Sequence, residues 1–403
     1  MANFNVSSME KRKLNILFIA TEYPSKKAKI KNYGGQASYL QNIGNLLIKK
    51  NHKISIYVIS NKILKSFENK IEILHFGFSI KLPFLEKISD FVNNILLSLH
   101  MNLVIYNENK KKKFDVIQYP SFLNFGIFLF FPSNSKKICR ISGITKLWRS
   151  YNKQYRNLFH RLSDFIEKKR VQESFKVYAP SRIIAKKASL IYSKKIHTIN
   201  SPFLELEKKN YRKLNGLKNK EKTILFVGTL NRVKGFDLLA DAFFQVFEKH
   251  KNVNLIICGR NEKLDKEVNS LNYIFNKCKI YKSKIRYFGI LPKKNIFSLY
   301  KKIDAVIIPS RLDNFPNVMI EALLFKKPII GFSNSSLDEI IIDGKNGFLA
   351  RKKNSKELFD KIDEFLNITI QKKIRLNKNI TKLCNKFKKI NYEKKIIDFY
   401  NTN

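Results

Sequence analysis

The chain has 403 residues, of which 44% are hydrophobic and 13% aromatic, enough to build two hydrophobic cores of ordinary domain size. This composition excludes intrinsic disorder and fibrous repeats. The formal net charge is +46, from 78 basic and 32 acidic residues. The charge indicates a polyanionic partner, an anionic membrane, or a compositional bias toward Lys, Asn and Ile that runs through the chain, so it identifies no partner by itself.

The four cysteines lie far apart and form no CxxC pair, which argues against a disulfide framework or a structural metal and favours a reducing cytoplasm. The basic residues 11–13 and the apolar residues 14–20 imitate a short signal peptide but lack a small-residue cleavage site, so a first strand is predicted there. The apolar run 122–131 is about half the length that crosses a bilayer. We expect a cytoplasmic protein that is peripheral to a membrane at most.

Two segments show the succession of apolar strand, glycine-bearing loop, amphipathic helix and second strand. The first covers residues 14–59 and the second covers residues 223–258. Further strands are predicted at 115–119, 137–141, 176–179, 285–288 and 304–308. Strands that alternate with helix-length patterns favour parallel sheets covered by helices on both faces. The sequence therefore predicts an α/β protein with two doubly wound domains, whose ligands bind between the carboxyl ends of the strands.

Residues 200–222 are polar and lack a sustained period, so the domain boundary is placed there, with domains at 1–203 and 204–387. Between residues 61 and 113 the pattern is hardest to interpret. A helix predicted at 91–106 either packs in the core, forms a dimer, or lies on anionic lipid beside the basic run 110–113.

The most informative stretch, residues 307–322, contains a buried strand, a loop with Asp313, and a helix through Glu321. Unpaired amides at the start of such a helix bind anions, while carboxylates accept hydrogen bonds from sugar hydroxyls. Arg232 and Lys234 follow another predicted strand and together could neutralise a diphosphate, and Gly228 allows close backbone approach there. Taken singly, Asp313 and Glu321 are also ordinary helix acids, and the two cations an ordinary basic loop.

Together these features resemble the family 4 glycosyltransferases, retaining nucleotide-sugar enzymes of the GT-B fold. The resemblance rests on residues 227–235, 258–259, 287–289, Tyr300, 309–310, 313–321, 327–328 and 343–347, and in the first half on 20–24, 34–35 and 52–54. It also implies that a helix at about 388–403 rejoins the first domain.

The resemblance implies roles for individual residues. Arg232 and Lys234 grip the donor diphosphate and, with Asp313, are the predicted catalytic residues, and Glu321 holds the ribose. Asp313 stands where the family usually has Glu. The remaining predicted donor-binding residues are Gly34, Gly35, Gly228, Gly259, Phe288, Phe315, Asn317 and Val318. Ser142 stands where many relatives have His, which leaves Arg140, Ser142 and Arg149 as candidates for acceptor binding.

The implied function is transfer of a sugar from a nucleotide-diphosphate sugar to a hydroxyl of a glycan or lipid-linked glycan in bacterial surface polysaccharide synthesis. No Asp-any-Asp motif is present, so we expect neither a metal nor another cofactor. Peripheral contact with an anionic inner membrane is one interpretation of the charge. Two alternatives remain open: a non-catalytic sugar-binding protein, and a nucleic-acid-binding protein. Nucleic acid is not an expected partner, because no base-reading helix, aromatic RNA-binding strand or zinc motif emerges.

Overall fold

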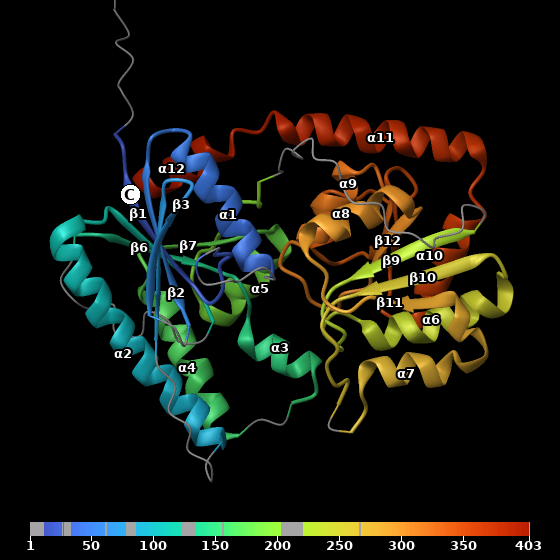
Figure 1. Ribbon diagram of the computed structural model, residues 1–403, viewed down its shortest axis with the longest axis horizontal. Helices are drawn as coiled ribbons and strands as arrows, with labels where there is room; N and C mark the ends of the chain where they lie inside the picture. Colours follow the sequence, from blue (N-terminus) through green and yellow to red (C-terminus); the bar gives the residue numbers. More distant parts are fainter. Residues whose placement is uncertain are drawn as a thin grey trace, which may run out of the picture.

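The computed structural model describes residues 12–25, 27, 34–60, 63–77, 86–122, 134–154, 157–202, 221–265 and 267–402. Two sheets occupy separate halves of the molecule (Figure 1). The first sheet, in spatial order, contains β3 (Leu64–Glu68), β4 (Ile71–Phe76), β2 (Lys53–Ile59), β1 (Asn15–Ala20), β5 (Val116–Pro120), β6 (Lys136–Arg140), β7 (Lys176–Ala179) and β8 (His197–Thr198). The second contains β11 (Ile285–Tyr287), β10 (Val253–Cys258), β9 (Lys222–Val227), β12 (Ala305–Ile308), β13 (Ile329–Phe332) and β14 (Gly347–Ala350).

Among the described strands, every paired neighbour is parallel except β3 with β4. The helices of the first half are α1 (Gly35–Ile48), α2 (Glu86–Lys112), α3 (Thr145–Tyr151), α4 (Leu158–Glu173) and α5 (Arg182–Tyr192). Those of the second are α6 (Phe236–Lys249), α7 (Ser270–Lys277), α8 (Lys293–Lys302), α9 (Asn317–Leu324), α10 (Ser355–Leu366) and α11 (Ile370–Lys388), with the short 3-10 helices η1 (Lys279–Lys284) and η2 (Ser336–Glu339).

Alternate residues of β1 enter different cores because successive side chains of a strand point to opposite faces of the sheet. Leu17 and Ile19 pack in one cluster, and Ile16 and Phe18 pack in another. The second sheet has a single larger cluster, to which α6 contributes its apolar face. Both sheets are thus buried on two sides, as the apolar strand patterns predict. The prediction of an α/β architecture with two sheets of parallel strands is confirmed, apart from the antiparallel edge strand β3.

The last helix, α12 (Tyr392–Asn401), packs on the first sheet although it follows α11 of the second half (Figure 1). Ile396, Ile397 and Tyr400 enter the same cluster as Ile16. The Tyr400 hydroxyl donates a 2.7 Å hydrogen bond to Oε1 of Gln118 on β5. The predicted boundary between the domains falls on residues 203–220, which lie outside the described part of the chain, so the division at 203/204 stays a prediction.

The segment that was hardest to interpret contains a hairpin and one long helix. β3 and β4 are antiparallel, and α2 extends beyond the predicted helix 91–106 at both ends. One face of α2 packs in the first core through Met101 and Ile105, while Leu99 and Leu103 on the opposite face are exposed. Within the described ranges, no helix is both long and apolar enough to cross a membrane.

Candidate active site

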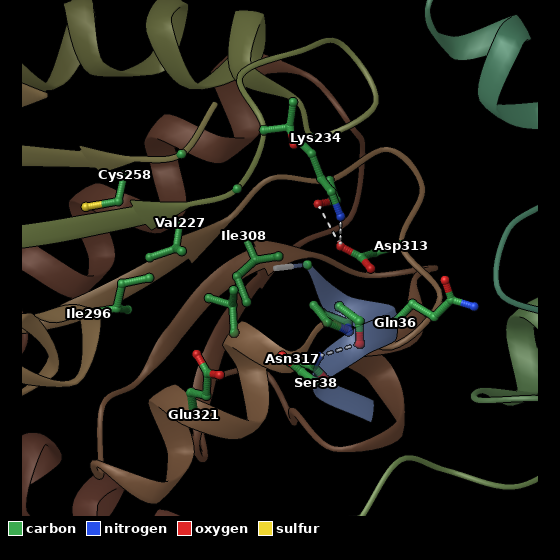
Figure 2. Close-up of a pocket in the computed structure, with 18 of the residues that line it drawn as sticks. Gln36, Ser38, Val227, Lys234, Cys258, Ile296, Ile308, Asp313, Asn317 and Glu321 are labelled. Carbon is green, nitrogen blue, oxygen red and sulfur yellow. Dashed lines mark hydrogen bonds and ion pairs between the residues drawn. The ribbon is translucent and has the colours of Figure 1, made fainter. Parts of the chain in front are cut away.

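A cavity of about 620 Å³ lies between the two halves, where strands of both sheets end. The first half lines it with residues that follow β1 and β6, and the second half with residues that follow β9, β10 and β12. Figure 2 shows Lys234, Asp313, Asn317 and Glu321 around this space. Twelve of the predicted site residues line it: Gly34, Gly35, Arg140, Ser142, Gly228, Lys234, Gly259, Asp313, Phe315, Asn317, Val318 and Glu321.

Two glycines allow the loops of the second half to touch one another. Gly235 begins α6 with φ of +70°, and a Cβ there would lie 1.8 Å from the carbonyl oxygen of Pro309. Gly259 has φ of +143°, and a Cβ there would lie 1.9 Å from the carbonyl oxygen of Gly228. Any larger residue would push these loops apart, so the glycines hold the loops after β9, β10 and β12 in register at the cavity.

Lys234 and Asp313 form an ion pair across these loops, with 2.6 Å between Nζ and Oδ2. The same Oδ2 accepts a 3.4 Å hydrogen bond from Ser310, and the Lys234 amide donates to Oδ1 of Asn231. Both side chains keep some solvent exposure, 33% for Lys234 and 15% for Asp313. A cation and a carboxylate are therefore placed side by side at the cavity wall, available to a phosphate and to a sugar hydroxyl respectively.

Two helices start at the cavity from opposite sides. α9 begins at Asn317 directly after Pro316, and α1 begins at Gly35 directly after Gly34. The Asn317 side-chain amide donates a 3.1 Å hydrogen bond to the carbonyl oxygen of Gly35, which joins the two halves (Figure 2). The amide groups of a helix start carry a partial positive charge, so two anion-attracting ends face one space.

Glu321 lies one turn inside α9 and has partners from α8. Lys293 Nζ lies 3.3 Å from Oε1, and the Tyr300 hydroxyl donates a 3.2 Å hydrogen bond to Oε2. Burial raises the pKa of Glu321 above its ordinary value, although Lys293 and Tyr300 oppose this. The carboxylate is held in one orientation and can accept hydrogen bonds from a ligand that enters the cavity.

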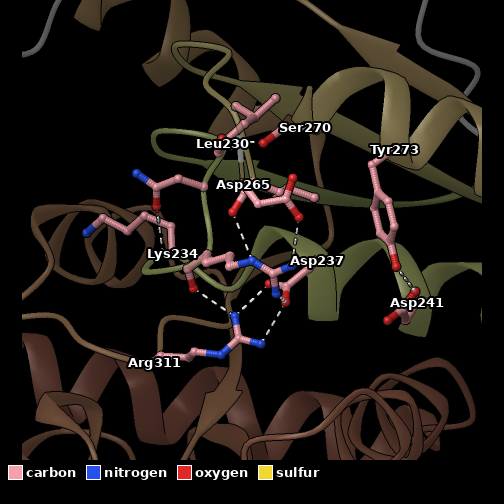
Figure 3. Close-up of polar contacts among 11 residues, drawn as sticks. Leu230, Lys234, Asp237, Asp241, Asp265, Ser270, Tyr273 and Arg311 are labelled. Carbon is pink, nitrogen blue, oxygen red and sulfur yellow. Dashed lines mark hydrogen bonds and ion pairs between the residues drawn. The ribbon is translucent and has the colours of Figure 1, made fainter. Parts of the chain in front are cut away.

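Arg232 is placed differently from Lys234, because it is absent from the cavity lining in the described part of the chain. Its guanidinium donates to the Leu264 carbonyl at 2.9 Å and contacts Asp237 at 3.1 Å and Asp265 at 3.4 Å. Asp237 also binds Arg311 with two hydrogen bonds, a network drawn in Figure 3. The predicted diphosphate contact of Arg232 requires its side chain to leave these partners.

The three candidate acceptor residues fall in two places. Arg140 and Ser142 line the cavity, and Arg140 donates a 2.9 Å hydrogen bond to the Ser142 hydroxyl. Arg149 is buried on α3, pairs with Asp164, and does not reach the described cavity wall. Phe288 also stands away from that wall and packs against the core of the second half.

Sequence reasoning missed several residues of the cavity. Glu22 caps the start of α1, with both carboxylate oxygens 2.9 Å from the Gly34 amide. Asn314 donates from its side chain to the Ser142 carbonyl at 2.5 Å, and Lys293 pairs with Glu321. Glu22 lies two residues after the predicted strand 14–20, within the stretch 20–24 on which the resemblance rests, and Asn314 adjoins Asp313, so position along the chain was the available signal. Nothing in the sequence signalled Lys293.

Apolar contacts also join the halves beside the ion pair. Val233 and Leu312, the neighbours of Lys234 and Asp313, are buried in the first-half cluster with Ile144 and other residues. On another side, Glu339 of the second half accepts hydrogen bonds from the Arg182 amide and from Asn200. The residues that carry the site are thus fixed by contacts with both halves.

No group of three or more His, Cys, Asp or Glu side chains that could hold a metal occurs in the ranges that the structure describes. The expectation of a metal-independent reaction stays a prediction.

Part of the chain is similar to known glycosyltransferases. Residues 207–389 match the family Glycosyl transferases group 1. An uncharacterized glycosyltransferase of Methanocaldococcus jannaschii is 32% identical over 163 residues, and the capsular polysaccharide biosynthesis glycosyltransferase CapM of Staphylococcus aureus is 24% identical over 163 residues. Each match covers 40% of this chain and 40% of the relative, so the chain spans about two fifths of the length of these relatives.

Solved structures match almost the whole chain. Sucrose-phosphate synthase from Thermosynechococcus elongatus has a TM-score of 0.73 at 14% identity, covering 96% of both chains. HepE of Anabaena in complex with UDP and glucose has a TM-score of 0.66 at 15% identity, covering 97% of this chain and 100% of the other. At these identities the likeness establishes the architecture, which is the GT-B fold.

Proposed function

We propose that this GT-B protein, with its group 1 glycosyl transferase domain at residues 207–389, transfers a sugar from a nucleotide-diphosphate sugar to a hydroxyl of a glycan or lipid-linked glycan. The observation that carries the proposal is the cavity between the halves, where Lys234, Asp313, Glu321 and two helix starts converge. The proposed product belongs to surface polysaccharide synthesis, which is the role that the name of the capsular relative states for that protein.

In the proposed reaction the bond between the anomeric carbon and the diphosphate breaks, and the acceptor oxygen bonds to the same carbon. The acceptor's proton passes to the departing diphosphate, on the face from which it leaves, so the configuration is retained. Lys234 and the amides that begin α9 stabilise the diphosphate charge, Asp313 orients the sugar, and Glu321 accepts hydrogen bonds from the ribose. The proposed chemistry needs no metal, and membership of family 4 is part of the same proposal.

A nucleotide-binding experiment tests the donor side. Thermal unfolding is followed with UDP, GDP, ADP, TDP, CMP and their sugar conjugates, because a ligand at about one hundred times its Kd adds roughly 2.7 kcal/mol to stability. We expect one nucleotide to raise the Tm, and Lys234→Ala and Glu321→Ala to abolish the rise. Lys251→Ala, which removes an exposed lysine that follows α6, is the matched control. If every nucleotide leaves the Tm unchanged, the proposed function is wrong.

We also propose that the protein works at the cytoplasmic face of a membrane with anionic lipid. The support is the exposed apolar side chains of α2 and α4, which run side by side in Figure 1, together with the net charge of +46. These side chains are Leu99, Leu103, Leu158, Leu162 and Phe165. Vesicle cosedimentation tests this: Leu103→Glu should reduce binding to phosphatidylglycerol vesicles, and equal binding to neutral vesicles would contradict it.

A further inference from the structure

Arg140, the last residue of β6, presents a buried cation to the cavity. The residue is only 8% exposed, and within the described chain no carboxylate forms an ion pair with it. One terminal nitrogen donates a 2.9 Å hydrogen bond to the Ser142 hydroxyl, and Nε is buried without a hydrogen-bond partner. The guanidinium carbon lies 3.9 Å from the centre of the Tyr39 ring.

This isolation distinguishes Arg140 from the other buried or half-buried cations of the cavity region. Lys234 is paired with Asp313, Lys293 with Glu321, and Arg232 with Asp237 and Asp265. Removing a charge from water without a counter-charge is costly, and one hydroxyl and one ring compensate only part of that cost. A group that the described part of the chain does not supply therefore fits beside Arg140. Its chemistry is an oxyanion, because the planar guanidinium binds phosphate or carboxylate through two parallel hydrogen bonds.

The surroundings hold Arg140 in this position. The hydroxyl groups of Tyr39 and Tyr178 are 2.7 Å apart. The Tyr178 hydroxyl donates a hydrogen bond to Oε1 of Gln118, and the Tyr400 hydroxyl donates to the same oxygen. On the other side, the Ser142 carbonyl accepts from Asn314, the neighbour of Asp313. The guanidinium is thus positioned by a buried network of the first half and tied to the loop that carries the donor-side ion pair.

We propose that Arg140 binds an oxyanion carried by the acceptor, so that the sugar is transferred to a phosphorylated or carboxylated molecule. The anion lies on the first-half wall, across the cavity from Glu321. Burial of the guanidinium excludes contact with a flat membrane surface, so the anionic group has to enter the cavity as part of the acceptor. The assignment to the acceptor rests on the proposed function, whereas the oxyanion site rests on the geometry of Arg140 alone.

The test uses the full chain, with and without saturating UDP, and calorimetric titration of three probes. Glucose 6-phosphate and glucuronate represent soluble acceptors with a phosphate or a carboxylate, and monomeric octyl phosphate, with octanol as its uncharged counterpart, represents a lipid-linked one. Uncharged glucose is the reference. We expect at least one oxyanion probe to bind more tightly than its uncharged counterpart, and Arg140→Gln to weaken it about tenfold or more, because a hydrogen-bonded charge is lost.

The matched control is Arg260→Gln, which removes the same charge from an exposed arginine on the opposite wall of the cavity. An equal loss in both variants, or equal affinity for charged and uncharged probes, would overturn the inference. Arg140→Lys separates charge from shape and should recover only part of the affinity. A purely structural role for Arg140 predicts a lower Tm with unchanged selectivity for the oxyanion, and that result would also overturn the inference.

UDP binding reports separately on the proposed function. If the protein binds an oxyanion through Arg140 but binds no nucleotide, the oxyanion site stands and the proposed transferase activity is rejected.

Discussion

Glu22 binds the Gly34 amide with both of its carboxylate oxygens, each at 2.9 Å, and so places a negative charge at the start of α1. A Cβ on Gly34 would lie 2.6 Å from that carboxylate. If the proposed donor diphosphate uses the same helix start, the two anions compete for it. We therefore expect Glu22→Gln to strengthen UDP binding several-fold and to lower the Tm of the ligand-free protein slightly.

Calorimetric titration of UDP measures this effect, and Glu248→Gln, an exposed glutamate of α6, controls for the change in net charge. Unchanged or weaker binding in Glu22→Gln would show that the diphosphate does not approach α1.

Leu312 provides a test of the contact between the halves. It is 9% exposed, lies in the first-half cluster, and directly precedes Asp313. We expect Leu312→Ala to loosen this contact, to increase the radius of gyration measured by small-angle X-ray scattering, and to weaken UDP binding about tenfold. Leu190→Ala alters an exposed leucine of α5 and should do neither. A variant that stays as compact as the wild type but loses UDP binding would contradict the role in closure.

Glu167 should make stability depend on pH. Burial raises the pKa of this carboxyl on α4 to about 7, from an ordinary value of 4.5, despite hydrogen bonds from Thr145 and Tyr192. Below about pH 4.5 the group is neutral in both states. As the pH rises to 7 the unfolded chain ionises first, so the folded state loses stability, on the order of 3 kcal/mol in total.

Glu167→Gln removes this titration. We expect the variant to match the wild type at pH 5 and to exceed its free energy of unfolding at pH 8, as measured by urea denaturation. Asp360→Asn, on the exposed side of α10, should show no such difference between the two pH values. A variant that is less stable than the wild type at pH 8 would mean that Glu167 is held ionised by its two hydroxyl partners.

Arg232 offers a test of rearrangement on donor binding. Its three partners hold it outside the cavity, so a diphosphate has to compete with Asp237 and Asp265 for it. We expect Arg232→Ala to weaken UDP binding about tenfold, and Asp265→Asn to strengthen it, because one competing charge is removed. Arg351→Ala, at an exposed site, is the control. Equal UDP affinity in all four proteins would assign Arg232 to loop structure alone.

The sequence predicted the sheet strands well where apolar runs are uninterrupted, as in β1 and β9, because burial on both faces requires such runs. It missed the β3–β4 hairpin for a specific reason. Asn69 and Lys70 form its turn with φ of 50° and 65°, a left-handed conformation that usually requires glycine. Without Gly or Pro the turn gave no signal, and Leu64–Glu68 exposes Phe67 while it buries Ser66, the reverse of the usual amphipathic strand pattern.

The candidate site was predictable in composition but not in orientation. Lys234, Asp313, Asn317 and Glu321 follow strand ends or begin a helix, and such positions converge at one edge of parallel sheets. The direction of Arg232 depends on Asp265, which is brought near it only by the fold. Nothing in the sequence therefore indicated that the side chain of Lys234 lines the cavity while that of Arg232, two residues earlier, does not.

The contact between Tyr400 and Gln118 has a consequence for biosynthesis of the protein. The hydroxyl network that positions Arg140 ends on α12, which follows both sheets in the order of the chain. When both sheets have been translated, the nascent chain still lacks the helix that completes the first core. Full assembly of the cavity is therefore delayed until α12 has also left the ribosome.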